Sequence, residues 1–108
     1  MSRSQRDKGR RGERCAELLL LDRDYIDVQR LPCGREGPDI ICYDDKGTRW
    51  VVEVKNRAVI AMRDFRKQCR SNAQKHRGKA MLLVKLPDTR SWLVERQGHR
   101  PVVWTEKG

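Results

Sequence analysis

Two acidic residues and a lysine near the middle of the chain could together do chemistry on a phosphate. Asp39 stands in the segment GPDII, and Glu53 and Lys55 stand in the segment VVEVKN. Two carboxylates that lie close together repel each other unless a cation lies between them, and Mg²⁺ takes oxygen ligands. A metal ion held by Asp39 and Glu53 could polarise a phosphate and lower the pKa of a bound water. Lys55 could orient or deprotonate that water, or neutralise the charge developing on phosphorus, so these residue types predict phosphodiester hydrolysis.

A β-hairpin is the element that must bring these side chains together. Residues 39–44 and 49–55 are the expected strands, and a short polar turn separates them. Glu53 and Lys55 are two residues apart, so both point to one face of their strand, while the valines beside them point to the other face. The acid and the lysine therefore share a face whatever the register of the hairpin.

The turn of this hairpin decides whether Asp39 joins them. A three-residue loop at residues 45–47 suits a type I turn followed by glycine in the left-handed region. Asp39 then lies opposite Glu53 on the same face, with the Cβ atoms of the pair ~5 Å apart. A two-residue loop would instead pair Asp39 with Val54 and separate the acids, unless a bulge compensates.

The remaining pattern predicts an α/β domain with a mixed β-sheet and flanking helices. The expected elements are a helix at about 9–21, a strand at 24–30, a helix at about 58–77 that ends before Gly78, a strand at 80–86, and segments at 91–96 and 101–105 that form two strands or a strand and a tail. The crossover through the second helix should place strand 80–86 parallel to strand 49–55. Residues 1–8 are expected as a basic flexible tail, and residues 9–108 as a single domain.

Each expected helix carries an apolar stripe. In the first helix Glu13 falls on the stripe, so it should face the core. The other members of that stripe are Gly9, Gly12, Ala16, Leu19 and Leu20. The stripe of the second helix consists of Ala58, Met62, Phe65, Cys69 and Ala73. The opposite side of the second helix forms a basic face of Arg63, Arg66, Lys67, Arg70 and Arg77.

Charge is the strongest compositional signal. The chain has 25 Lys and Arg against 15 Asp and Glu, a net charge of +10, and basic residues gather in residues 1–14 and 62–79. Such clusters are typical of nucleic-acid-binding proteins, with solubility or binding to an anionic membrane as alternatives. No run has the length of a membrane span, and no apolar signal core opens the chain, so a cytoplasmic protein is expected. The four cysteines are far apart and are expected to be packing residues.

The order of these motifs resembles the PD-(D/E)XK nuclease superfamily. KGRRGER opens the helix that bears Glu13, a glycine-containing loop leads to GPDII, and VVEVKN is followed by a basic helix and an apolar strand. This order is similar to that of archaeal-type Holliday junction resolvases and their small phage-encoded relatives. The likeness covers roughly residues 8–86 and implies a restriction-endonuclease-like core of order α-β-β-β-α-β.

The resemblance also implies an activity and a metal site. The activity is that of a Mg²⁺-dependent endodeoxyribonuclease, with Mn²⁺ able to substitute, acting as a homodimer on branched DNA in recombination and repair. The metal would be held by Asp39, Glu53 and the main-chain carbonyl of Val54, with Lys55 as the catalytic lysine. Glu13 would be an accessory acid near a second metal.

Further residues are assigned from the same reasoning. A polar residue on the helix after the lysine often touches such a site, and Gln68 is the candidate here, with Gln74 in reserve. The residues expected to contact DNA are Arg10, Arg11, Arg35, Arg63, Arg66, Lys67 and Arg70.

Simpler interpretations stay open. Asp39 could only form a turn with Pro38, Glu13 could only pair with a neighbouring arginine, and Gln68 could be an ordinary surface residue. The function could instead be that of a related nuclease acting on nicked, flapped or single-stranded DNA. It could also be that of a non-catalytic basic module that binds DNA.

Overall fold

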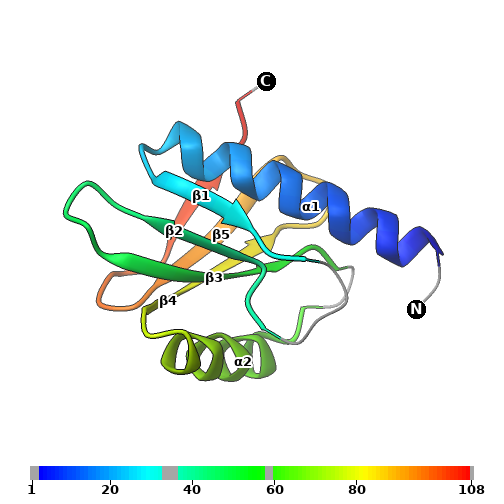
Figure 1. Ribbon diagram of the computed structural model, residues 1–108. Helices are drawn as coiled ribbons and strands as arrows, with labels where there is room; N and C mark the ends of the chain where they lie inside the picture. Colours follow the sequence, from blue (N-terminus) through cyan, green and yellow to red (C-terminus); the bar gives the residue numbers. More distant parts are fainter. Residues whose placement is uncertain (1–2, 33–36, 58–59, 108) are drawn as a thin grey trace.

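A six-stranded β-sheet with one helix on each face makes up the part of the chain that the structure describes (Figure 1). This computed structural model describes residues 3–32, 37–57 and 60–107, and for residues 3–10 it describes the backbone alone. The elements are α1 Arg3–Asp22, β1 Ile26–Arg30, β2 Ile40–Tyr43, β3 Arg49–Lys55, α2 Met62–Lys75, β4 Lys79–Lys85, β5 Ser91–Arg96 and β6 Val102–Thr105. The strands follow their sequence order across the sheet. Neighbouring strands are antiparallel, except that β3 and β4 are parallel as predicted.

The hairpin of β2 and β3 has the register that a three-residue turn predicts. Gly47 adopts a φ of 80°, in the left-handed region that the turn requires. Ile40 pairs with Val52 across the hairpin. Asp39 lies just before β2, with its N–H bonded to the Val52 carbonyl, so the hairpin has the register that was predicted to bring it beside Glu53.

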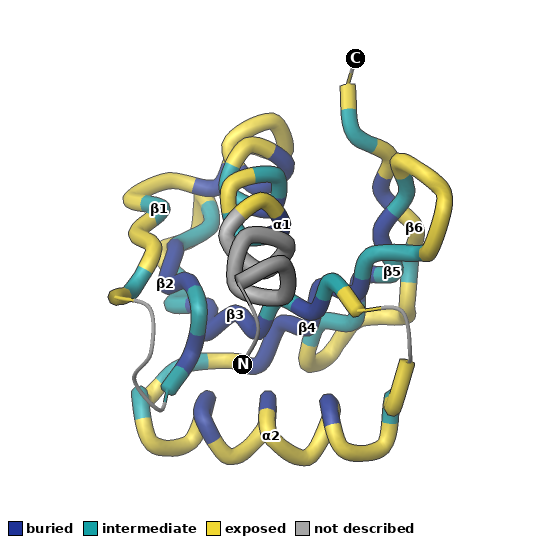
Figure 2. The backbone as a smooth tube through the Cα atoms, turned by 90° about the vertical axis from the view of Figure 1, so that its right-hand side faces the viewer, coloured by how far each residue is buried: buried dark blue, intermediate teal, exposed yellow. Residues whose placement is uncertain are grey.

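The sheet buries apolar side chains on both faces, and Figure 2 shows the buried positions of α2 turned toward it. On the α1 side the core contains Ala16, Leu19, Leu20, Trp50, Val52, Met81, Leu83 and Trp92. On the α2 side it contains Val51, Phe65, Cys69, Ala73, Ala80, Leu82 and Val84. Strand β4 contributes to both layers, which explains its unbroken apolar run. Burial raises the pKa of the Cys42 and Cys69 thiols to about 12, and both are free cysteines, in keeping with a packing role.

Both helices have boundaries that differ from the predicted ones. Helix α1 begins at Arg3 rather than near residue 9, so most of the expected flexible tail is helical. That segment is rich in Arg, Lys and Gln and has no proline, so nothing local prevents helix. Helix α2 begins at Met62 rather than at 58, after the β-branched Ile60, and it ends at Lys75. Ala58 of the predicted stripe lies outside the described residues.

The edges of the sheet also depart slightly from expectation. Strand β1 begins at Ile26 rather than at 24, because Asp24 has a φ of 67° in the turn after α1. At the C-terminus the chain forms two strands, which is the first of the two predicted alternatives. Within the described residues, no helix combines the length and apolarity needed to cross a membrane.

Candidate active site

Asp39 and Glu53 meet where β2 begins and β3 nears its end. The backbone N–H of Asp39 donates to the Val52 carbonyl at 3.0 Å, and its Oδ2 accepts from the Val54 N–H at 2.7 Å. The Asp39 carboxylate is therefore held against β3. Glu53 lies on the α2 face of the sheet and is only 1% exposed. The hairpin thus brings together the two acids that the sequence singled out.

The environment of Glu53 opposes its ionisation. Burial and then the charge of Asp39 raise the pKa of Glu53 to about 7. Two neighbours act in the opposite direction: the Asn72 amide donates to Glu53 Oε1, and Lys55 Nζ lies 3.9 Å from Oε2. The effects of burial and of the Asp39 charge are larger, so the pKa of Glu53 is raised overall. In the absence of a metal ion, Glu53 therefore keeps its proton up to near-neutral pH.

Lys55 is fixed by three neighbours. It is 7% exposed, and its Nζ donates to Gln68 Oε1 at 2.8 Å. The same nitrogen lies 5.3 Å from the centre of the Phe65 ring, within the range of a cation–π contact. With Glu53 on its other side, the ammonium group has little freedom to leave the acidic pair.

Gln68 lies on α2 against Lys55. The reserve candidate Gln74 lies instead in surface hollows at the end of α2, lined also by Ala73 and Gly78. Of the two candidates, Gln68 is therefore the one that contacts Lys55, and its part in the site stays a prediction.

Asn72 is the site residue that the sequence analysis missed. It is buried on the inner side of α2, and its side chain bonds to Glu53. A signal was present: Asn72 stands between Cys69 and Ala73 on the apolar stripe, and a polar residue there needs a buried partner. The carboxylate of Glu53 is that partner.

Glu13 comes from the other helix, α1. It is half-buried on the stripe of α1, as predicted, but α1 covers the sheet face opposite to that of Glu53. Gly12 packs closely on Asn56, because a Cβ added to Gly12 would lie 2.8 Å from the Asn56 Cβ. Helix α1 therefore crosses just beyond the end of β3. The described residues contain no cluster of three or more His, Cys, Asp or Glu side chains able to hold a metal ion. The accessory role of Glu13 therefore stays a prediction.

The pair of acids nonetheless suits a hard divalent cation. Both side chains offer carboxylate oxygens, the donors that Mg²⁺ prefers. Their mutual repulsion and the raised pKa of Glu53 are what a bound cation would offset. Val54 lies between Glu53 and Lys55 in β3, and its N–H is already bonded to Asp39, which leaves the carbonyl as its possible contribution.

The residues expected to contact DNA differ in their surroundings. Four of them are exposed on the outer sides of the two helices: Arg11, Arg63, Lys67 and Arg70. Arg66 instead makes two bonds to Glu95, at 2.8 and 2.7 Å, which offset its charge. Arg35 lies outside the described residues, as does the side chain of Arg10. The basic face of α2 is therefore weaker than the sequence suggests.

Comparison with known proteins identifies the fold. No protein-family profile and no curated protein matches the sequence. The structure is similar to that of Hjc, a Holliday junction resolvase from the archaeal hyperthermophile Archaeoglobus fulgidus. The TM-score is 0.57 with 20% sequence identity, and the match covers 86% of this chain and 87% of the other. The chain therefore has the restriction-endonuclease-like fold that the motif order predicted.

Proposed function

We propose that this protein is a metal-dependent DNA endonuclease that hydrolyses phosphodiesters, with a four-way junction as its substrate. The observation that carries the proposal is the group of Asp39, Glu53 and Lys55 on the hairpin of a basic protein, with Glu53 and Lys55 buried and Asp39 half-buried beside them. The likeness to the Archaeoglobus fulgidus resolvase supports this assignment, because the fold is the same and that protein acts on Holliday junctions.

The acids would hold Mg²⁺, with Mn²⁺ as a substitute. When bound, the cation supplies positive charge that polarises the scissile phosphate and lowers the pKa of a water. Asp39 is positioned by its bond to the Val54 N–H, and Glu53 is positioned by Asn72. The carbonyl of Val54 is proposed as a third ligand.

Lys55 would act on the reacting atoms. Its ammonium is held by Gln68 and Glu53 at the acidic pair, where it can orient the attacking water or neutralise charge on phosphorus. The water attacks phosphorus and gives up one proton to solvent, the bond from phosphorus to the leaving oxygen breaks, and that oxygen takes up a proton from solvent. Lys55 can keep its proton throughout this step, because it acts through its positive charge.

The substrate geometry and assembly are also proposals. A junction needs two matched cuts, so the proposed form on DNA is a homodimer, with Glu13 of each chain as an accessory acid. Structure-selective enzymes contact phosphates rather than base edges, in keeping with the excess of arginine and lysine here.

The decisive experiment compares a synthetic four-way junction with a linear duplex, each incubated with the protein in Mg²⁺ and in EDTA. We expect cleavage of the junction in Mg²⁺, none in EDTA, and much less cleavage of the duplex. Lys55→Ala is the control for a contaminating nuclease. Cleavage of both substrates at one rate would favour a nuclease of broader substrate range, and binding without cleavage would favour a non-catalytic module.

A further inference from the structure

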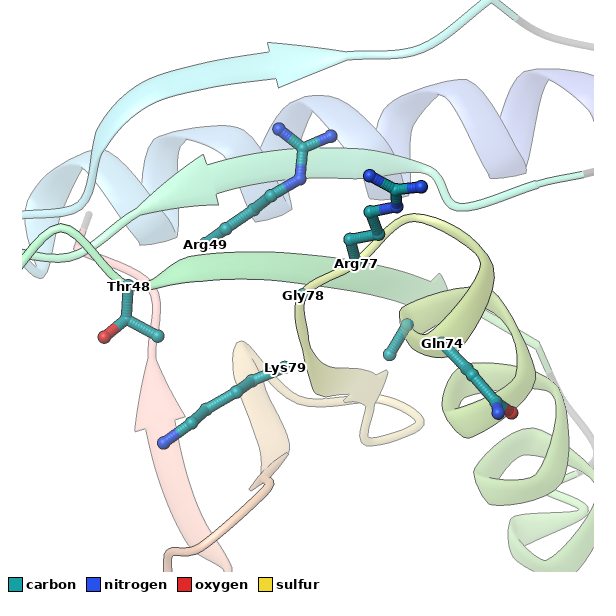
Figure 3. A pocket seen from close by; sticks show the side chains of 7 residues that line it. Thr48, Arg49, Gln74, Arg77, Gly78 and Lys79 are labelled. Atoms are coloured by element: carbon teal, nitrogen blue, oxygen red, sulfur yellow. The ribbon is translucent and has the colours of Figure 1, made fainter.

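A second charged cluster lies at the other end of β3, and no part of the proposed catalytic machinery uses it. An open hollow of about 370 Å³ is lined there by Thr48, Arg49, Gln74, Arg77 and Lys79 together with small residues (Figure 3). Three of these side chains are cationic, and none of the lining residues is acidic. The hollow therefore has the character of a site for an anion.

Arg49 is held in place at this hollow. Its Nε donates to the His76 carbonyl at 3.1 Å, and its Nη1 donates to the Tyr43 hydroxyl at 2.5 Å. A guanidinium has five N–H donors, and these bonds within the described part of the chain use two of them. Arg49 is thus oriented in advance and keeps donors for a ligand.

Arg77 is brought beside Arg49 by the way α2 ends. Gly78 packs so closely on β3 that an added Cβ would lie 2.9 Å from the Arg49 carbonyl oxygen. Arg77, just before it, adopts a φ of 56°, a conformation that glycine usually supplies. Figure 3 shows the guanidinium groups of Arg49 and Arg77 on the same side of the hollow, with Lys79 extending the other way.

These two guanidinium groups have no acidic counterpart in the described structure. The five ion pairs found there involve neither Arg49 nor Arg77. Two like charges side by side repel each other, and an anion between them would remove that repulsion. Phosphate suits such a pair, because guanidinium groups bind its oxygens with two parallel hydrogen bonds.

The cluster lies on the same sheet face as the acidic pair. Every second residue of β3 points to this face: Arg49, Val51, Glu53 and Lys55. Across the hairpin, Tyr43 of β2 pairs with Arg49. Glu53 is four positions after Arg49 in β3, which corresponds to ~14 Å along the strand. DNA carries one phosphate per ~3.4 Å of helix axis on each strand, so the two sites are a few nucleotides apart.

We propose that Arg49 and Arg77 bind a backbone phosphate of the DNA a few nucleotides from the scissile one, with Lys79 adding to the local positive potential. This inference rests on the proposed function, because it takes DNA as the ligand. It adds a second anchoring point that fixes how the strand runs across the hairpin. The anchor carries no sequence information, since a phosphate is the same at every base.

The test uses Arg77→Gly, because glycine prefers the backbone conformation found there and the fold should keep its stability. Binding to a labelled junction is measured in EDTA across a salt series. We expect affinity to fall several-fold at about 0.1 M salt, and the slope of log K against log salt to flatten by about 0.9. Arg23→Ala is the matched control, since Arg23 is exposed at the end of α1, which covers the opposite face. Equal effects of both variants would overturn the inference.

Two further arms separate the possible outcomes. Thermal unfolding of both variants is compared with that of the wild type, and unchanged stability of Arg77→Gly assigns its weaker binding to the lost contact. Inorganic phosphate is titrated at constant ionic strength. Stabilisation by phosphate that Arg77→Gly abolishes, with DNA affinity unaltered, would mean a small-anion site and would overturn the DNA assignment. If the wild type cuts junctions while Arg77→Gly binds normally, the inference fails and the proposed function stands.

Discussion

The two ends of β3 carry opposite charges on the same face of the sheet. At one end Glu53 lies beside Asp39, and at the other Arg49 lies beside Arg77. Each end places two like charges together, and helix α2 borders both: Asn72 bonds to Glu53, and the His76 carbonyl accepts from Arg49. Such pairs cost stability in the absence of a ligand of opposite charge.

The two ends differ in how that cost is relieved. Glu53 is buried and can take up a proton, so its pKa is raised to about 7. An arginine cannot lose its proton in a protein, and the Arg77 side chain is exposed, so water screens it. We therefore expect the acidic end to respond to pH and to the proposed metal, and the basic end to respond to salt and to the proposed DNA. Substitutions at the two ends should separate these responses.

The largest effect should come from removing a member of the acidic group. Asp39→Asn and Glu53→Gln should each lower the rate of junction cleavage by about 10³-fold or more, because the charge that holds the metal is lost. DNA binding should be kept or tightened, since repulsion of phosphates is relieved. Single-turnover cleavage and binding in the same buffer test this. A variant that still cuts at near the wild-type rate would remove that residue from the site.

Lys55→Ala should lose cleavage to a similar degree while keeping metal affinity, because lysine is not a ligand. Calorimetric titration with Mn²⁺ separates the two roles. Loss of metal binding would mean that Lys55 mainly holds the acidic pair together.

The next effect is on the stability of the metal-free protein. The pKa of Glu53 is about 7 in the fold and about 4.5 without its surroundings. The folded state keeps a proton that the unfolded state has lost between these values, so the free energy of unfolding falls as pH rises from about 4.5 to 7. The full loss is on the order of 3 kcal/mol. We expect a higher melting temperature at pH 5 than at pH 8, measured in EDTA.

Glu53→Gln should remove most of this pH dependence and raise the melting temperature at pH 8. The matched control is Glu95→Gln, because the pKa of Glu95 is lowered by its bond to Arg66. That control should destabilise the protein at pH 8, the opposite sign. Adding Mg²⁺ should stabilise the wild type at pH 8 and should leave Glu53→Gln nearly unchanged. A wild type with no gain from Mg²⁺ would contradict a metal site at this pair.

A smaller effect is expected at Asn72, which acts through Glu53. Asn72→Ala removes the bond that orients the carboxylate, and groups that support metal ligands usually account for 10- to 100-fold in affinity or activity. The Mg²⁺ concentration for half-maximal cleavage should rise by about that factor. Ser71→Ala, an exposed neighbour on the same helix, is the control. A lower rate with an unchanged Mg²⁺ requirement would assign Asn72 to packing alone.

The acidic end was predictable from sequence because its geometry is local. Turn chemistry at Gly47 fixes the hairpin register, and this register brings Asp39 beside Glu53. Strand alternation then adds Lys55 to the same face. The basic end was not predictable, since Arg49 and Arg77 meet only because α2 docks with its last turn on β3.

Helix α1 illustrates a similar limit. A helical stripe predicts that a residue faces the core, but it does not predict which face of the sheet the helix covers. The same limit concealed Asn72, whose partner depends on how α2 is rotated over β3. The start of α1 at Arg3 was missed because the residues before Gly9 show no apolar periodicity and Gly9 itself disfavours helix.

The smallest expected effect distinguishes arginines within the basic face of α2. Arg63→Ala and Arg70→Ala should each flatten the salt dependence of junction binding by about one unit of log K per log salt, if each contacts a phosphate. Arg66→Ala should flatten it less, because Glu95 already holds that guanidinium in a two-bond pair and DNA would have to compete for it. Glu95→Gln frees Arg66 and should steepen the slope and tighten binding. The same salt series used for Arg77 measures all four variants. An Arg66→Ala slope equal to that of Arg70→Ala would show that the ion pair opens on DNA, and the basic surface would then extend from the hollow at Arg49 along the whole outer side of α2.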